Sequence, residues 1–154
     1  MAMLREGDTA PDFSLDADDG GLVSLDDLLK DGPLVLYFYP ADFTPVCTAE
    51  ACSIRDMHDE MLDVSLQVVG VSPQSAESHE KFKQRHHLPF RLLHDGDKKV
   101  IRAYGVDGPF GLGVRRATFL IGTDKTIEGR VVSDLFVGSH TAFIKKAIEA
   151  RAQK

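Results

Sequence analysis

The sequence predicts an α/β fold with a central mixed β-sheet flanked by helices. Two continuous apolar runs, residues 34–39 and 66–71, are rich in β-branched and aromatic side chains, a pattern typical of strands that are covered on both faces. Segments with helical periodicity separate the strand candidates, and this alternation is typical of a layered α/β domain. At 154 residues the chain can bury one continuous core. We therefore expect residues 1–154 to form a single domain.

The first half of the chain is expected to begin with an N-terminal β-hairpin over residues 13–24, because the Asp-Asp-Gly-Gly run at 18–21 favours a turn. The 34–39 strand comes next. A helix is expected over residues 47–62, where apolar side chains recur at helical spacing. This helix leads into the 66–71 strand.

The second half starts with a helix over residues 75–87, which follows a Ser-Pro start signal at 72–73. A short helical turn is expected over residues 97–103. The chain ends with an amphipathic helix over residues 139–152. The three remaining strands are predicted at residues 90–93, 117–121 and 127–132.

This order of elements fits a thioredoxin-like sandwich. In that arrangement the 34–39 strand ends at the carboxyl edge of the sheet, and a turn leads directly into the N-terminus of the 47–62 helix. Open α/β sheets generally place their functional sites at this edge. The turn is therefore the expected location of the site.

The only two cysteines, Cys47 and Cys52, lie at the start of this helix. The unpaired amides at a helix N-terminus attract an anion, so they favour the thiolate form of a thiol placed there. Cys52 is close enough in sequence to capture an oxidised Cys47, and the pair therefore indicates redox chemistry. Two buried structural thiols or a zinc site are the alternatives, although no histidine has a paired ligand spacing with the cysteines.

Charge and composition exclude several classes of function. The formal net charge of -6 and the sequence pI of about 5.4 argue against a nucleic-acid or anionic-membrane partner, which would need a basic face. The N-terminal residues form no apolar targeting segment, and no apolar run is long enough to span a membrane. We therefore expect the protein in the cytoplasm, where a cysteine pair is more often redox-active or metal-binding than structural.

The segment Pro40-x-x-x-Thr44-x-x-Cys47 resembles the active-site signature of the peroxiredoxins. Three further features resemble the bacterioferritin-comigratory, or Q-type, subfamily: Glu50 with Cys52, the run Gly7-Asp8-x-Ala10-Pro11-Asp12-Phe13, and the run Arg116-x-Thr118-Phe119-Leu120-Ile121. The resemblance covers nearly the whole chain.

The resemblance implies a thiol-dependent peroxidase for hydrogen peroxide and organic hydroperoxides. Cys47 would be the peroxidatic cysteine, which is oxidised to a sulfenic acid, and Cys52 the resolving cysteine that forms an intramolecular disulfide with it. The Thr44 hydroxyl and nearby backbone amides would hydrogen-bond the peroxide oxygens. The Arg116 guanidinium would hold the thiolate, and Pro40 would fix the turn and shield the cysteine from water.

The resemblance also implies the partners. The substrate would be a hydroperoxide, and thioredoxin or a similar dithiol protein would reduce the disulfide, with no cofactor and no metal. The subfamily suggests a monomer, with a weak dimer as the alternative. A second functional class stays open, in which the same disulfide switch serves a peroxide-sensing protein that reports to a binding partner. Catalytic turnover with a reductant separates the two classes.

Three positions have more than one interpretation, and two others depart from the subfamily pattern. Arg115 and Arg116 would face opposite sides of a strand, and alternation alone does not tell which one turns toward the cysteine; the motif spacing favours Arg116. Glu50 is either an ordinary acid in the first turns of the helix or the partner of an arginine in a carboxylate fork. Phe43 and Val46 depart from the subfamily pattern and are expected to add apolar bulk beside the cysteine.

Helix geometry adds an expectation about the two cysteines. Residues five apart in a regular helix are separated by about 7.5 Å of rise and roughly 140° of rotation. The Cα atoms of a disulfide generally lie within about 7 Å of each other. A disulfide between Cys47 and Cys52 therefore requires the first helical turns to unwind, and we expect oxidation to melt part of residues 47–55.

Overall fold

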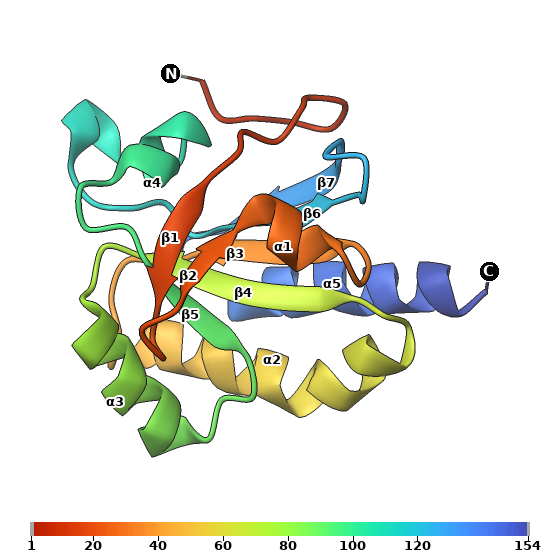
Figure 1. Ribbon diagram of the computed structural model, residues 1–154, viewed down its shortest axis with the longest axis horizontal. Coiled ribbons are helices and arrows are strands. Elements are labelled where there is room, and N and C mark those ends of the chain that lie inside the picture. Colours follow the sequence, from red (N-terminus) through yellow and green to blue (C-terminus); the bar gives the residue numbers. More distant parts are fainter. Residues whose placement is uncertain (1, 154) are drawn as a thin grey trace.

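The computed structural model describes residues 2–153 and is built around one mixed seven-stranded β-sheet (Figure 1). Its strands are β1 (Ser14–Ala17), β2 (Leu22–Ser24), β3 (Leu34–Phe38), β4 (Gln67–Ser72), β5 (Arg91–His94), β6 (Ala117–Ile121) and β7 (Ile127–Val132). They lie in the order β2-β1-β5-β4-β3-β6-β7. The central strands β3, β4 and β5 run parallel, whereas β6 is antiparallel to β3 and β1 is antiparallel to β5. The predicted mixed sheet and N-terminal hairpin are both present.

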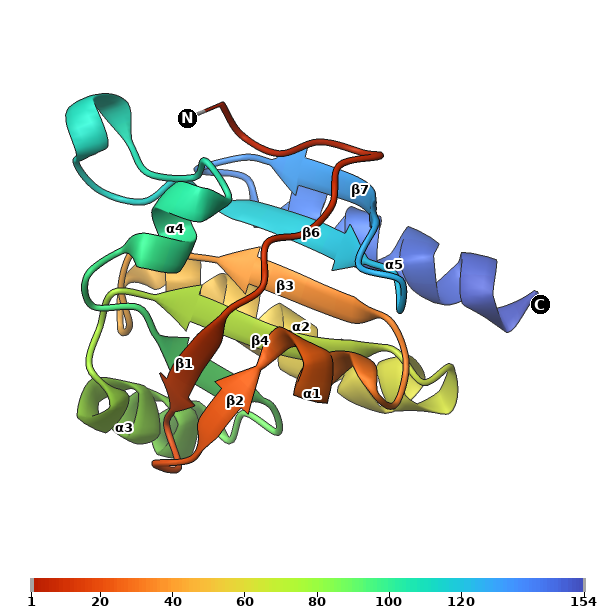
Figure 2. The same ribbon diagram turned by 45° about the horizontal axis from the view of Figure 1, so that its top comes forward.

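Helices cover both faces of this sheet (Figure 2). They are α1 (Leu25–Leu29), α2 (Pro45–Asp63), α3 (Ala76–His86), α4 (Lys99–Ala103) and α5 (Val137–Ala152). Side chains of α2, α3 and α5 form one apolar core with one face of the sheet, and side chains of α1 and α4 form a second core with the other face. Within residues 2–153, no helix is both long and apolar enough to cross a membrane.

Strand β3 lies between the two cores, and this position accounts for its apolar sequence. Leu36 and Phe38 point into the core beneath α1 and α4, whereas Val35 and Tyr37 point toward α2. All residues of the strand are buried. The Tyr37 ring lies against Gly70 of β4, where a Cβ atom would come within 2.7 Å of the ring. The strand next to β3 therefore needs glycine at this position.

Some boundaries differ from the sequence-based expectation. Helix α2 begins at Pro45 rather than at residue 47, because proline fits the first helical position. The five-residue helix α1 was not expected; Ser24 caps it by accepting a hydrogen bond from the Asp27 N–H over 3.1 Å. A short 3₁₀ helix over Pro109–Gly111 was not expected either. These short elements leave the predicted order of the main strands and helices unchanged.

Candidate active site

The segment between β3 and α2 lies at the carboxyl edge of the parallel strands. Half-buried Pro40 follows the strand, Thr44 immediately precedes α2, and Cys47 is the third residue of the helix. The first helical hydrogen bond runs from the Thr48 N–H to the Thr44 carbonyl oxygen over 2.8 Å. The Cys47 N–H precedes that bond and so belongs to the free amides at the helix N-terminus. The helix dipole therefore favours negative charge at Cys47.

A buried arginine faces the cysteine. Arg116 Nη2 donates a hydrogen bond to Cys47 Sγ over 3.0 Å, and these residues are only 3% and 1% exposed. The guanidinium is fixed from behind, because its Nε donates to the Asp134 carbonyl oxygen over 3.2 Å. Arg115 instead pairs with the Asp134 carboxylate at the surface over 3.0 Å. The structure therefore brings Arg116, and not Arg115, to the cysteine.

Glu50 is the second partner of this arginine. Its Oε1 accepts a hydrogen bond from Arg116 Nη1 over 2.7 Å, so the guanidinium bridges Glu50 and Cys47 in the fork arrangement. The carboxyl group is buried. Burial raises the pKa of Glu50 from 4.5 to about 7, although the charge and hydrogen bond of Arg116 act in the opposite direction. Both protonation states of Glu50 are therefore populated near neutral pH.

This raised pKa makes stability depend on pH. Between the ordinary pKa of 4.5 and the folded-state pKa of about 7, the folded protein holds a proton on Glu50 that the unfolded chain has lost. The free energy of unfolding should therefore fall as the pH rises through this window. In Glu50→Gln this contribution is absent, so the variant should gain about 3 kcal/mol relative to wild type across the window. Urea unfolding at several pH values measures the difference.

The matched control for this prediction is Glu60→Gln, which replaces an exposed glutamate on the same helix and should follow the wild-type pH dependence. Parallel curves for wild type and Glu50→Gln would show that Glu50 is ionised throughout the window.

The Thr44 hydroxyl takes part in the turn before α2. Its Oγ1 donates a hydrogen bond to the Ala41 carbonyl oxygen over 3.0 Å, and the residue is exposed. Because its one proton is used within the turn, the hydroxyl oxygen can offer its lone pairs to a ligand that donates a proton. Thr44 is thus arranged as a hydrogen-bond acceptor at the end of the helix that carries Cys47.

Cys52 lies within regular helix, on α2. Both cysteines are free thiols in this structure, with Cys47 buried and Cys52 half-buried. Since five residues of α-helix separate Cα atoms by about 7.5 Å along the axis alone, the two sulfur atoms cannot bond while α2 stays intact. The folded helix is therefore the reduced form of the protein.

A buried polar network that the sequence did not reveal anchors the turn to α3. The Asp42 carboxylate accepts hydrogen bonds from the Tyr39 hydroxyl (2.7 Å) and the Ser78 hydroxyl (2.8 Å), and it contacts His79 Nδ1 over 2.8 Å. The other ring nitrogen of His79 faces the Leu93 carbonyl oxygen over 3.1 Å. Each ring nitrogen of His79 therefore lies within hydrogen-bond distance of an oxygen, and the buried His79–Asp42 contact joins the turn to α3.

Replacing Asp42 with asparagine should destabilise the protein by about 1–3 kcal/mol, because an amide NH₂ in place of one carboxyl oxygen cannot accept the buried hydrogen bonds made to that oxygen. The free energy of unfolding in urea measures the effect. Asp56→Asn, at an exposed aspartate of α2, should change it by less than about 0.5 kcal/mol. Equal small effects of the two variants would show that this buried network does not stabilise the fold.

The two departures from the subfamily pattern lie apart from each other. Phe43 has a positive φ of 64° and packs its ring edge-on against Phe82 of α3, with the centroids 5.2 Å apart. Its ring therefore packs against α3. Val46 lines a groove of about 610 Å³ between the start of α2 and the segment Leu135 to Ser139.

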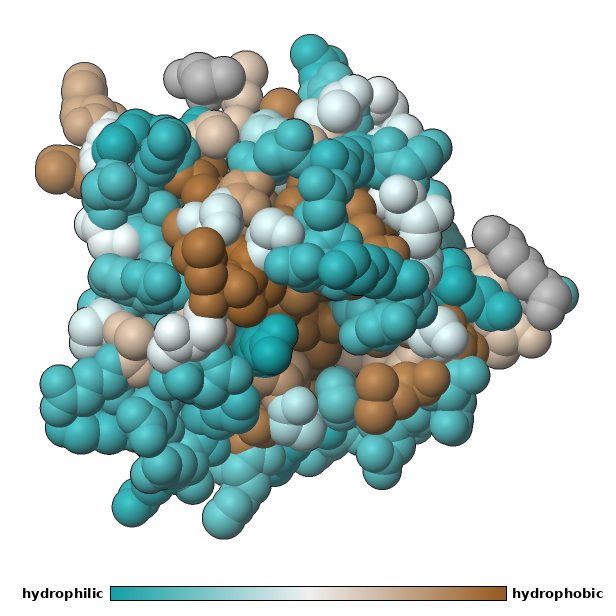
Figure 3. Space-filling model, in the orientation of Figure 1, coloured by the Kyte–Doolittle hydropathy of each residue, from teal (hydrophilic) through white to brown (hydrophobic). Residues whose placement is uncertain are grey.

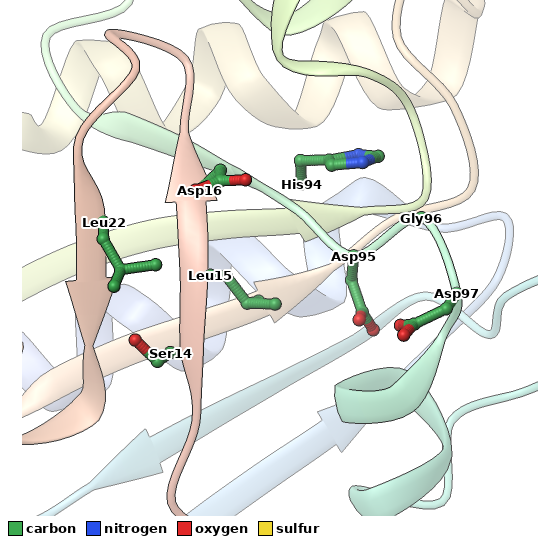
Figure 4. Close-up of a pocket in the computed structure, with 8 residues that line it drawn as sticks. All are labelled: Ser14, Leu15, Asp16, Leu22, His94, Asp95, Gly96 and Asp97. Atoms are coloured by element: carbon green, nitrogen blue, oxygen red, sulfur yellow. The ribbon is translucent and has the colours of Figure 1, made fainter.

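Another hollow lies away from the cysteines. Apolar side chains gather at the centre of the face in Figure 3, over α1 and the neighbouring strands, and a cavity of about 370 Å³ opens between the hairpin and the end of β5. Figure 4 shows the carboxylates of Asp95 and Asp97 side by side at its rim. Its lining contains none of the expected site residues. Among residues 2–153, no group of three or more His, Cys, Asp or Glu side chains is arranged to hold a metal ion.

Known proteins resemble this chain over nearly its full length. The model of the AhpC/TSA family matches residues 6–130. The chain is 41% identical to peroxiredoxin Bcp of Bacillus subtilis over an alignment of 160 positions, gaps included. This alignment covers 98% of this chain and 99% of that protein. Among solved structures, peroxidoxin BcpB of Mycobacterium tuberculosis is 37% identical, with a TM-score of 0.87 and coverage of 97% of both chains.

A further solved structure comes from a study of the alkyl peroxide reduction activity of the Xanthomonas campestris bacterioferritin comigratory protein. It is 29% identical, with a TM-score of 0.83, and the match covers 91% of this chain and 92% of that one. Together these likenesses confirm the thioredoxin-like sandwich and the resemblance that the motifs indicated.

Proposed function

The chain belongs to the AhpC/TSA family, as a peroxiredoxin of the Bcp and Q type, and we propose that Cys47 carries its peroxidase reaction. As a member of this group it is a thiol peroxidase that reduces hydroperoxides. The observation that carries the assignment to Cys47 is the 3.0 Å hydrogen bond from Arg116 to its sulfur. This bond joins a guanidinium charge and the positive end of a helix at one thiol.

The first step is attack of the Cys47 thiolate on the terminal oxygen of the hydroperoxide. A sulfur–oxygen bond forms and the oxygen–oxygen bond breaks, so the sulfur is oxidised by two electrons and the peroxide is reduced. The leaving alkoxide or hydroxide takes up a proton and departs as alcohol or water. Cys47 is left as a sulfenic acid, the reversible stage of cysteine oxidation.

The surrounding groups stabilise the charge that moves from sulfur to oxygen. Arg116 and the free amides at the start of α2 donate toward the reacting atoms, as in an oxyanion hole. The Thr44 hydroxyl accepts the hydrogen of the hydroperoxide, since its own proton is given to Ala41. Pro40 rigidifies the turn between β3 and α2. Because these groups are held by one sheet and its helices, we propose that residues 1–154 act as a single domain.

Cys52 resolves the sulfenic acid in the second step. Its thiol attacks the Cys47 sulfur, a disulfide forms, and the hydroxyl group leaves as water. The intact helix forbids this bond, so the first turns of α2 must unwind before it forms. Unwinding also carries the disulfide out of the buried site. A dithiol protein can then reduce it by thiol–disulfide exchange.

We propose thioredoxin, or a dithiol protein like it, as the reductant. The proposal rests on the disulfide being intramolecular and local, which suits exchange with a second dithiol. We further propose that the protein acts as a monomer in the cytoplasm, where reduced thiols are maintained. A weak dimer through the exposed side chains of Leu135 and Phe136 is the alternative, and sedimentation of the reduced and oxidised protein distinguishes the two.

Peroxide consumption coupled to thioredoxin, thioredoxin reductase and NADPH tests the function. Continuous turnover, with NADPH oxidised in proportion to hydroperoxide, is expected for hydrogen peroxide and for an organic hydroperoxide. A single stoichiometric oxidation without turnover would instead favour the peroxide-sensing alternative. Replacing thioredoxin with glutathione and glutaredoxin in the same assay separates a thioredoxin-type reductant from a glutathione-based one.

A further inference from the structure

The second carboxylate oxygen of Glu50 points away from Arg116 into the protein. Among residues 2–153 this Oε2 accepts no hydrogen bond, although it is fully buried. A titratable group on that side is His140 of α5, whose Nδ1 lies 3.6 Å from it. Glu50 and His140 are each only 1% exposed, so solvent does not separate them. The peroxidase reaction described above gives His140 no role.

The hydrogen bonds of His140 determine where its proton lies. Its Nε2 lies 2.8 Å from the Ser133 carbonyl oxygen, which can only accept, so Nε2 carries a hydrogen. Its Nδ1 lies 2.8 Å from the Thr118 hydroxyl and also faces Glu50. In a neutral ring this Nδ1 bears a lone pair, which would repel the lone pairs of an ionised Glu50 carboxylate. The 3.6 Å separation is too long for a hydrogen bond, but one proton carried by either group of the pair removes that repulsion.

The charges around Glu50 show what this proton does. Arg116 approaches from β6 and Cys47 from its own helix, while Tyr37 of β3 and His140 of α5 close the other sides. With this proton the Glu50–His140 pair is neutral, and the positive charge of Arg116 is available to Cys47. Without it, a second negative charge competes with the sulfur for the same guanidinium.

The pKa values of both residues are shifted in the direction that lets the pair hold one proton. Burial raises the pKa of Glu50 to about 7, while burial and the charge of Arg116 lower the pKa of His140. The usual order of proton affinity of a carboxyl group and an imidazole is thus reversed, which favours Glu50 as the member of the pair that holds the proton.

We propose that His140 is a positioning residue of the peroxidase site: the buried Glu50–His140 pair carries one proton, and this keeps the Glu50–Arg116 pair aligned on Cys47. The inference rests on the proposed roles of Cys47 and Arg116. His140 acts through Glu50, contacts no substrate, and works from a helix whose sequence gives no sign of the site.

Two replacements of His140 separate this role from packing. Asparagine can place a polar atom near the position of Nδ1, facing Glu50, whereas glutamine can place one near Nε2, facing Ser133. Each is made in a Cys52→Ser chain, so that Cys47 is the only thiol. The measurements are the fraction of Cys47 present as thiolate at neutral pH, from its ultraviolet absorbance, and the rate of its single oxidation by hydrogen peroxide.

His140→Gln should lower the thiolate fraction and slow the oxidation about tenfold, as expected when a charged hydrogen bond of the arginine fork is weakened. His140→Asn should recover most of the rate. The matched control is His94→Gln, which replaces a half-buried histidine of β5. The Nδ1 of His94 lies 2.6 Å from the Gln74 carbonyl oxygen. This control should leave both measurements unchanged.

A double-mutant cycle tests whether His140 acts through Glu50. In a Glu50→Ala chain, adding His140→Gln should slow the oxidation by less than about twofold. Full additivity of the two losses would overturn the proposal, and so would equal rates for wild type and His140→Gln. Equal losses for the asparagine and glutamine variants would show a packing role only. If the proposed function itself were wrong, the parent Cys52→Ser chain would not be oxidised rapidly at all, so the two failures are distinguishable.

Discussion

Replacing Cys47 with serine is expected to abolish peroxide turnover, with a loss of more than about 10³-fold in the coupled assay. A serine hydroxyl does not ionise near neutral pH, so neither Arg116 nor the amides of α2 have an anion to stabilise. The buried geometry is retained because oxygen is smaller than sulfur. Loss of activity therefore reports the missing nucleophile rather than a changed fold.

Cys52→Ser provides the contrasting variant. This chain should also lose turnover, but it should still consume one equivalent of hydroperoxide rapidly and stop at the sulfenic acid. A dimedone adduct on Cys47 detects that species. Peroxide consumption by Cys47→Ser at a wild-type rate would mean that another group is the nucleophile, and continued turnover by Cys52→Ser would mean that a thiol from outside the chain resolves Cys47.

Replacing Arg116 with methionine is expected to lower kcat/KM for hydroperoxides about 10²–10³-fold, the usual cost of removing one donor from an oxyanion-type site. The loss has two sources: the sulfur loses its cationic hydrogen-bond donor, and Glu50 loses the donor to its Oε1. Arg116→Lys keeps the charge but lacks the planar fork, so it cannot bridge Glu50 and Cys47 in the same geometry. Its activity should fall between those of wild type and Arg116→Met.

The neighbouring arginine is the natural control for this prediction. Arg115 has the same charge but lies at the surface in an ion pair with Asp134, so Arg115→Met should retain activity within about twofold. The rate of Cys47 oxidation under single-turnover conditions measures all three variants. Similar losses for Arg115→Met and Arg116→Met would mean that the net charge of this surface, rather than a specific contact, drives the reaction.

Much of the fold could be predicted from the sequence because the central strands are buried on both faces. Residues 34–39 and 66–71 have no polar face, and the structure shows why: each contributes side chains to both apolar cores. The same double burial explains why alternation could not decide between Arg115 and Arg116. Strand β6 is buried on both faces, so its sequence has no exposed polar face to mark the side toward α2.

The partners of the site were less visible because tertiary packing alone brings them together. Glu50 could equally be a first-turn acid, and only its 2.7 Å contact with Arg116 distinguishes the two roles. His79 and His140 each occupy one position of a helix, 37 residues from Asp42 and 22 residues from Thr118 respectively. A single histidine on the inner face of a helix is usual in a protein core, so no local pattern marks either residue.

Oxidation is expected to join Cys47 and Cys52 in a disulfide that the intact helix forbids. The most direct test treats the reduced protein with one equivalent of hydroperoxide, maps its disulfides by mass spectrometry without reduction, and compares the far-ultraviolet circular dichroism before and after. We expect a Cys47–Cys52 linkage within one chain and the loss of about two turns of helix, both reversed by a dithiol. A disulfide between two chains, or an intramolecular disulfide with an unchanged helical signal, would contradict this expectation.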